Sequence, residues 1–260
     1  MENWELRVKN ILKKIFFSQE LKEIEKLKEE NRKLKKENKK LHILNSSKDE
    51  LISAVSHEFK NPISIINGYI ETILTNELPD EMNRKFLNKI QRNSLRLSEL
   101  IDRLYLITRL ENEKVKIKFT KFDLCAAAKN IIESFNTDRI ELNCQKTPVY
   151  GDKTLIETVI YNLLSNAIKY SDDKITLNIT DTYLEVIDKG KGIDEKEIEL
   201  IKQKFYRIAK NDWDNSLGLG LAIVEKILKI HKTKLQIESQ KGKGSRFYFD
   251  ITSLKSKAQE

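Results

Sequence analysis

Cysteine, proline and glycine are scarce in this sequence, whose 260 residues include 2, 3 and 8 of them, respectively. Cys125 and Cys144 have no CxxC spacing and no histidine beside them, which argues against a disulfide framework and against a zinc site. No apolar run approaches the ~18 residues that span a membrane, and lysines interrupt the apolar residues near the start, unlike a secretory signal peptide. We therefore expect a cytoplasmic protein with reduced thiols.

Charges of both signs are abundant. Charged residues make up 34% of the chain and hydrophobic residues 39%, with a net charge of +8 and a pI of about 9.2. A basic balance can indicate binding to nucleic acid or to an anionic membrane. Here lysines are interleaved with glutamates, which indicates solvated faces, and we expect no nucleic-acid partner. No G-x-x-x-x-G-K-[ST] motif occurs, which excludes a P-loop protein.

The stretch from residue 53 to 74 combines helical periodicity with an unusual polar group. His57 and Asn61, at i and i+4, fall on one face of the predicted helix, and Glu58 can reach the imidazole from the side. Pro62 lacks a backbone donor and its ring clashes with the carbonyl of Glu58, so the helix should bend or loosen beside the histidine. Taken alone, the stretch also fits an amphipathic helix with a surface histidine.

The first 20 residues form an amphipathic segment, with apolar residues between positions 4 and 15 on one helical face and basic residues on its flanks. We expect this face to pack against a dimer mate or another protein. The alternative is peripheral contact of residues 1–17 with an anionic membrane, which we do not favour because the segment is short and carries few basic residues.

Residues 21–47 carry a heptad pattern. Leucines recur every seven residues and asparagines are offset from them by three: Leu27, Leu34 and Leu41, with Asn31, Asn38 and Asn45. Leucine at d with asparagine at a is typical of a parallel two-stranded coiled coil, and each buried asparagine costs stability while specifying the register. A single charged helix is the alternative.

Residues 48–112 are predicted to form an antiparallel helical hairpin. One helix carries His57 and ends near Asn76, and Pro79 and Asp80 begin a second helix that runs to about Glu111 with its own apolar stripe. A single hairpin cannot bury both stripes, whereas two copies can form a four-helix bundle. This predicts a homodimer.

Beyond residue 113 strands and helices are intermixed, which predicts an α/β sandwich with a mixed sheet over residues 113–252, followed by a tail, residues 253–260. The expected strands are residues 115–119, 139–142, 147–150, 174–180, 183–188, 234–239 and 245–251, and the expected helices are 124–135, 152–170 and 216–231.

Four groups in this half have residue types suited to a nucleotide. Asn162 and Asn166 share a helix face, where an amide oxygen could bind Mg²⁺, although a structural polar pair is the alternative. Asp188, Gly190, Gly192 and Ile193 follow a strand, where a carboxylate could accept a hydrogen bond from adenine and the glycines allow close backbone approach; an ordinary tight turn would have the same pattern. The other two groups are Lys204-Phe205-Tyr206-Arg207 and Ser216-Leu217-Gly218-Leu219-Gly220-Leu221, the latter opening a helix whose N-terminus favours anions.

In this order, His57-Glu58-x-x-Asn61-Pro62, the asparagine pair and the two glycine-rich groups resemble the sensor histidine kinases of two-component signalling, over about residues 48 to 252. The resemblance implies ATP and Mg²⁺ as cofactors, with the metal at Asn166 and adenine at Asp188. It places Lys169 and Tyr170 beside the phosphates and the base, Phe205 and Tyr206 at the start of a lid, and Gly218 and Gly220 at the triphosphate. Ser216 departs from the family, which usually has glycine there.

The resulting hypothesis is a protein histidine kinase. Neutral His57 attacks the γ-phosphate, Glu58 orients the ring and takes its proton, and Arg207, with Lys210 as a weaker candidate, stabilises the phosphoryl charge. As the resemblance implies, the phosphoryl group passes to an aspartate of a response regulator, and Asn61 could position a water for phosphatase action. The alternatives are a nucleotide-binding dimeric scaffold with weak kinase activity and an ATPase of the wider fold.

Overall fold

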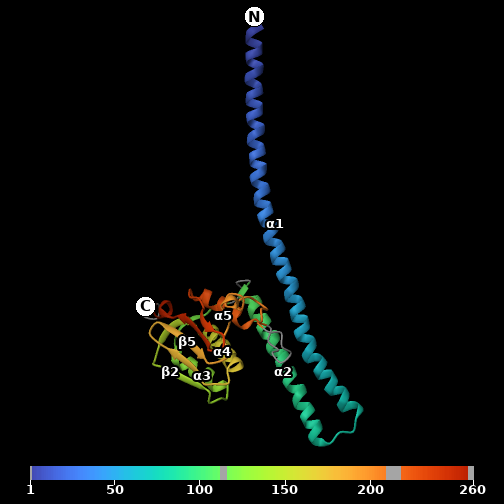
Figure 1. Ribbon diagram of the computed structural model, residues 1–260, viewed down its shortest axis with the longest axis vertical. Helices are drawn as coiled ribbons and strands as arrows, with labels where there is room; N and C mark the ends of the chain where they lie inside the picture. Colours follow the sequence, from blue (N-terminus) through green and yellow to red (C-terminus); the bar gives the residue numbers. More distant parts are fainter. Residues whose placement is uncertain (1, 112–115, 209–217, 257–260) are drawn as a thin grey trace. The chain divides into compact units, whose positions relative to one another are not determined.

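The computed structural model describes residues 2–111, 116–208 and 218–256, and it divides into two compact units, residues 1–55 and 56–260 (Figure 1). Helix α1 (Glu2–Thr75) supplies all of the first unit and continues into the second. In the first unit, Leu27 and Leu34 are 58% and 61% exposed in the single chain. The side chains of Leu41 and Asn45, and most of those in the first 20 residues, lie outside the described set.

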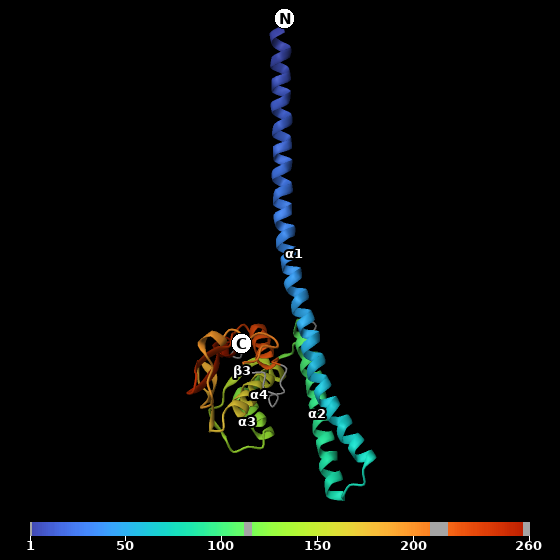
Figure 2. The same cartoon turned by 45° about the vertical axis from the view of Figure 1, so that its right-hand side comes forward.

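The second unit begins with a helical hairpin. The end of α1 turns back into α2 (Asp80–Glu111), which runs antiparallel to it (Figures 1 and 2). These ends confirm the predicted turn between the two helices, and Pro62 lies inside the continuous helix α1. Leu100 and Ile107 are buried, and the rings of Tyr69 and Phe86 lie 5.0 Å apart. Other large apolar side chains of the hairpin stay at least 40% exposed: Ile63, Ile65, Ile70, Leu74, Met82, Leu87, Leu95, Ile101 and Tyr105.

The α/β part contains a five-stranded mixed sheet, as predicted. Its strand order is β2-β4-β5-β7-β6, in which only the β2–β4 pair is parallel. The strands are β2 (Ile140–Cys144), β4 (Ile175–Ile179), β5 (Tyr183–Asp188), β6 (Gln236–Gln240) and β7 (Gly244–Asp250). A separate antiparallel pair consists of β1 (Phe119–Asp123) and β3 (Pro148–Asp152).

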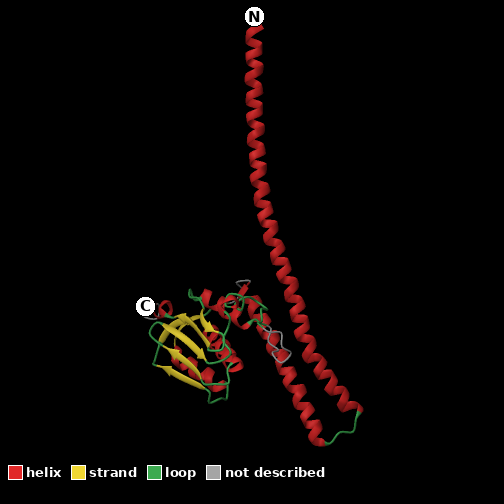
Figure 3. Cartoon of the chain, viewed as in Figure 1, coloured by secondary structure: helices red, strands yellow, loops and turns green. Residues whose placement is uncertain are grey.

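Three helices cover one face of this sheet (Figure 3). They are α3 (Leu124–Ser134), α4 (Lys153–Tyr170) and α5 (Gly220–Ile230). Between helices and sheet lies a core of fully buried side chains that include Ile160, Leu164, Leu177, Leu184, Ile223, Ile227 and Phe249. Each such side chain contributes roughly 1.5–3 kcal/mol by leaving water, so the α/β part completes its own core without a second chain.

Several predicted element bounds were wrong. The strand expected at residues 115–119 begins at Phe119, because Lys116 to Lys118 are exposed and the Lys118 amide donates to the Asp152 carboxylate instead of a strand partner. The helix expected from Ser216 begins at Gly220, and Ser216 itself lies outside the described residues. The expected tail starts with a short helix, α6 (Thr252–Ser256), which buries Leu254 against β3.

The expectation of reduced thiols was also wrong for this structure. Cys125, in the first turn of α3, and Cys144, at the end of β2, form a disulfide with their Cα atoms 5.8 Å apart. The two cysteines are 19 residues apart, and neither lies in a motif that indicates pairing. Only the packing of α3 beside β2 brings them together, which residue spacing alone does not predict.

Candidate functional site

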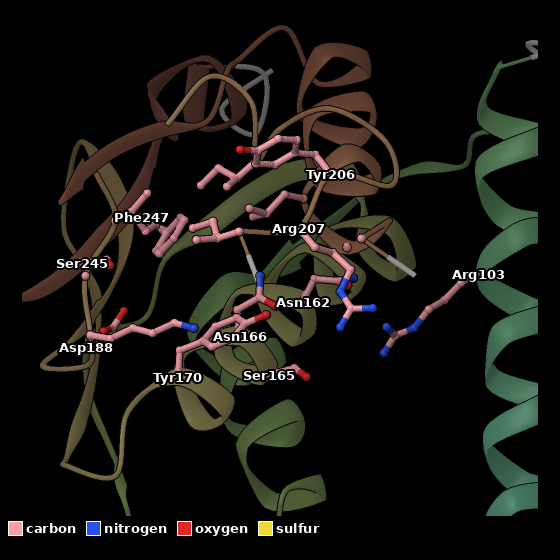
Figure 4. A pocket seen from close by; sticks show the side chains of 18 residues that line it. Arg103, Asn162, Ser165, Asn166, Tyr170, Asp188, Tyr206, Arg207, Ser245 and Phe247 are labelled. Carbon is pink, nitrogen blue, oxygen red and sulfur yellow. The ribbon is translucent and has the colours of Figure 1, made fainter. Parts of the chain in front are cut away.

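A pocket opens between α4, the end of β5 and the start of α5 (Figure 4). It brings together eleven of the residues predicted to bind a nucleotide or to act on it: Asn162, Asn166, Tyr170, Asp188, Gly192, Ile193, Tyr206, Arg207, Gly218, Gly220 and Leu221. These residues span about 60 positions of sequence, so the fold gathers motifs that the chain keeps apart.

Helix α4 presents the asparagine pair to the pocket. Asp152 caps the helix by accepting a hydrogen bond from the Leu155 amide at 3.1 Å, which sets where the first turn begins. Asn162 is buried and donates to the Thr158 carbonyl at 2.8 Å, so its oxygen points toward Gly220 at the start of α5. A Cβ at position 220 would approach that oxygen to 2.9 Å, which explains why glycine opens the helix there.

Asp188 is the buried acceptor at the other end of the pocket. It ends β5 at 5% exposure and accepts a hydrogen bond from the Gly190 amide at 2.8 Å. Burial raises the pKa of this carboxyl, an effect that its backbone hydrogen bonds with Gly190 and Ser245 partly offset. A carboxylate that keeps a free lone pair in a partly apolar pocket is suited to a donor such as an exocyclic amino group.

The loop after Asp188 is held close to neighbouring backbone. Gly192 has φ +62°, and a Cβ there would overlap the carbonyl of Gln240. The Gly242 amide donates to the Lys191 carbonyl at 2.7 Å, which joins this loop to the turn between β6 and β7. The turn between β6 and β7 therefore helps to hold the loop after Asp188 in place.

Basic side chains collect around Tyr170. The ammonium groups of Lys169 and Lys191 lie 4.9 and 4.5 Å from the centre of its ring. The pKa of Lys169 falls to about 8, first through partial burial and then through the positive charges of Arg207, Lys191, Arg103 and Arg96. Its side chain still keeps a large exposed fraction, so water moderates the effect.

Phe205 and Gly218 form the base of the segment predicted to be a lid. Both lie in the left-handed region, with φ of 64° and 63°, and the Phe205 amide donates to the Gly218 carbonyl at 3.1 Å. A bulky residue with positive φ is uncommon and is held by its surroundings. Lys210 and Ser216 lie between these two positions, outside the described residues.

His57 is exposed on α1, while its neighbour Glu58 is only 8% exposed. Glu58 pairs with two arginines: its Oε1 lies 3.3 Å from Nη1 of Arg207, and its Oε2 lies 3.6 Å from Nη2 of Arg96 on α2. The described contacts of Glu58 are thus to guanidinium groups and not to the imidazole of His57. The ion pair with Arg207 joins the histidine helix to the rim of the pocket.

Seven lining residues were not predicted from the sequence: Arg103, Ser165, Lys191, Ile201, Ile208, Ser245 and Phe247. Lys191 sits inside the predicted Asp188–Gly192 group and could have been included. Arg103 carries no local motif and reaches the pocket only because α2 packs against α5. Of the residues predicted to bind the nucleotide, Lys169, Gly190, Phe205 and Leu219 do not line the pocket, and Leu219 is buried at 1% exposure.

The residues present fit a magnesium nucleotide. Asn166 offers a hard amide oxygen inside the pocket, and Mg²⁺ bound through phosphates needs few protein ligands. Among the described residues, no cluster of three or more His, Cys, Asp or Glu side chains lies together. Asn166 offers an oxygen of the kind that such an ion binds.

Two family models match the chain. The His Kinase A (phospho-acceptor) domain matches residues 47–113, and the histidine kinase-, DNA gyrase B- and HSP90-like ATPase matches residues 151–255. The Phosphate regulon sensor protein PhoR of Haemophilus influenzae is 30% identical over 225 residues, which cover 81% of this chain and 52% of PhoR. The Adaptive-response sensory kinase SasA of Crocosphaera subtropica is 29% identical, with 78% of this chain and 59% of SasA covered.

Solved structures agree with these matches. The Acinetobacter baumannii histidine kinase AdeS aligns with a TM-score of 0.58 and 28% identity, covering 75% of this chain and 96% of that one. Histidine kinase ThkA in complex with response regulator protein TrrA aligns with a TM-score of 0.56 and 27% identity, covering 80% of this chain and 62% of that one.

The chain belongs to the sensor histidine kinases, with a helical phosphoacceptor region followed by an ATPase-type α/β domain. It spans about half the length of the curated relatives it matches. Among the described helices, none combines the length and the apolarity that crossing a membrane requires.

Proposed function

We propose that this chain is an ATP-dependent protein histidine kinase that phosphorylates itself on His57. The observation that carries the proposal is the ion pair between Glu58 and Arg207, which joins the residue next to the candidate phosphoacceptor to the rim of the nucleotide pocket. Through Glu58, the candidate phosphoacceptor His57 lies one residue from a side chain that contacts the phosphate-binding candidate Arg207, which supports a common reaction.

Different pocket residues would bind different parts of ATP, the phosphoryl donor. Asp188 accepts from the adenine amino group, Ile193 and Phe247 supply apolar walls, and Gly218, Gly220 and Leu221 bring the start of α5 to the phosphates. Lys169 and Tyr170 flank the phosphates and the base, and Phe205 and Tyr206 begin the lid. When bound, ATP would supply the γ-phosphoryl group, and Asn166 would hold Mg²⁺, which would neutralise part of the phosphate charge.

In the transfer, a nitrogen of neutral His57 forms a bond to the γ-phosphorus while the bond from phosphorus to the leaving oxygen of ADP breaks. Arg207 balances the charge on the moving group, and Glu58 accepts the proton that the imidazole loses. Glu58 can accept that proton only after it exchanges Arg207 for the imidazole, so the described ion pair belongs to a state before transfer.

We propose a homodimer. The exposed apolar stripe of the hairpin, at residues 48–112, which includes Leu87 and Ile101 but not Leu95, would be buried in a four-helix bundle with a second copy. Leu27 and Leu34 would lie in the seam of a coiled coil over residues 21–47. The catalytic domain would then be residues 113–252. The phosphoryl acceptor beyond His57 would be an aspartate of a response regulator, a proposal supported by the ThkA–TrrA complex. Asn61, exposed one turn from His57, would position water for the reverse phosphatase reaction.

Incubation of the full chain with Mg²⁺ and [γ-³²P]ATP tests the proposal. Wild type and His42→Gln, the matched control on the same helix, should take up label that acid removes and base leaves. His57→Gln should take up none while still binding ATP. Acid-labile label on His57→Gln would refute the assignment, and ATP binding without label on wild type would favour the dimeric scaffold.

A further inference from the structure

One residue at the mouth of the pocket comes from outside the α/β domain. Arg103 is half-buried on α2, in the same hairpin as His57, and it lines the nucleotide pocket together with Arg207. In Figure 4 its guanidinium group points toward that of Arg207 and toward the pocket. Neither the kinase motifs nor the ion pairs described above account for it.

Positive charge is concentrated at this mouth. Partial burial is the largest cause of the lowered pKa of Lys169, and the positive charges of Arg207, Lys191, Arg103 and Arg96 lower it further. Glu58 pairs with two members of this group, Arg96 and Arg207. Among the described residues, none forms an ion pair with Arg103. Like charges held this close destabilise one another, so the arrangement favours a polyanionic ligand.

The position of Arg103 indicates which part of a bound nucleotide it would contact. In the view of Figure 4, Asp188 and Arg103 lie at opposite ends of the pocket, with Asn166 and Arg207 between them. A nucleotide whose base meets Asp188 and whose phosphates meet Asn166 directs its terminal phosphate to the end where the two arginines face each other.

We propose that Arg103 is a further phosphate-binding residue, supplied by the helical hairpin, which contacts the terminal phosphate of ATP and thereby distinguishes ATP from ADP. The inference deepens the proposed function and rests on the same pocket. Because Arg103 lies on the hairpin, its contact with the triphosphate links the ATP-bound α/β domain to the helices that carry His57. ADP, which lacks the terminal phosphate, forms this link less well.

Calorimetric titration of the full chain with ATP, ADP and adenosine tests the proposal. Arg103→Gln should weaken ATP binding about tenfold, the value of one charge-assisted contact at a partly exposed site, and change ADP and adenosine binding less than about twofold. Arg103→Lys should recover part of the ATP affinity. Arg92→Gln is the matched control, because Arg92 is an exposed arginine of α2 that does not line the pocket, and it should bind all three ligands like wild type.

An equal loss of ATP and ADP affinity, or no loss of either, would overturn the proposal. If Arg103→Gln fails to fold by circular dichroism, Arg103→Ala is titrated in its place with the same expectations. The binding measurement needs no phosphoryl transfer, so its result is independent of the result of the labelling experiment. A wild type that never labels His57 refutes the kinase alone, whereas labelling without an Arg103-dependent preference for ATP refutes only the role of Arg103.

Discussion

The α/β domain and the helical hairpin bury their apolar side chains in different ways. Leu164 and Leu184 of the α/β domain have no exposed surface in the single chain, whereas Leu87 and Ile101 of α2 are 57% and 51% exposed. Both regions have regular amphipathic elements, so the difference lies in the number of layers available. A sheet covered by three helices closes a core by itself, but two helices have only each other. The hairpin is therefore the part of the chain whose stability should depend on a second copy.

A charge on the exposed stripe of α2 should give the largest effect. Leu87 and Ile101 are fourteen residues, or two heptads, apart, and Leu87→Glu would place one unpaired carboxylate from each copy into a four-helix bundle. We expect dimer affinity to fall about 1,000-fold, a cost of about 4 kcal/mol, measured by analytical ultracentrifugation.

Leu95→Glu is the matched control for Leu87→Glu. Leu95 is 60% exposed but lies on a different face of α2 from Leu87 and Ile101, so its substitution should leave the dimer intact. A monomeric wild type, or an equal effect of both substitutions, would show that the hairpin does not use this stripe and would remove the contrast with the α/β domain.

Reduction of the disulfide should destabilise the α/β domain and not the hairpin, because this cross-link lies in the α/β domain. Opening a bridge between residues 19 apart should lower the free energy of unfolding of that domain by about 3 kcal/mol, measured by urea denaturation with and without dithiothreitol. The double variant Cys125→Ser, Cys144→Ser should lack the dithiothreitol effect. A wild type that is indifferent to the reductant would mean that the thiols do not pair in solution.

Asp188→Asn should weaken ATP binding about 30-fold, since an amide cannot serve as a charged acceptor for the adenine amino group. Glu185→Gln is the control on the same strand, because Glu185 faces away from the pocket and pairs with Arg246. It should lower stability without changing ATP affinity. Because the pKa of Asp188 is raised above 3.8, its carboxylate takes up a proton at a higher pH than an ordinary aspartate does. ATP binding by wild type should therefore begin to weaken at that higher pH as the solution is acidified. A pH-independent affinity would contradict that role.

The sequence predicted most of this architecture and only part of the site. Periodicity located the two hairpin helices and the β4–β5 hairpin, because each depends on contacts within one stretch of chain. Motifs supplied Asn166 and Asp188. The sequence did not predict Arg103 or the Cys125–Cys144 bond, because Arg103 depends on the packing of α2 against α5 and the bond on the packing of α3 beside β2, and no local pattern indicates either.

His231 provides the smallest predicted effect and the last contrast between the two regions. It is buried at 3% exposure, where its Nε2 accepts from the Asp152 amide at 3.0 Å and its Nδ1 lies 2.8 Å from the Ile227 carbonyl. Burial lowers its pKa below 6.5, against smaller opposing effects of Ile227 and Asp152. The unfolded chain therefore binds the proton more readily, and stability falls as the pH drops through 6.5.

His231→Gln should cost about 1 kcal/mol at pH 8, where the wild-type hydrogen bonds are intact, and less at pH 5, where the neutral imidazole of wild type is disfavoured. Urea denaturation at both pH values measures the difference. His42→Gln, on the N-terminal part of α1, should leave the wild-type pH dependence unchanged. If His231→Gln costs the same free energy of unfolding at both pH values, the imidazole is not held neutral. The buried core of the α/β domain would then be no more sensitive to acid than the exposed hairpin.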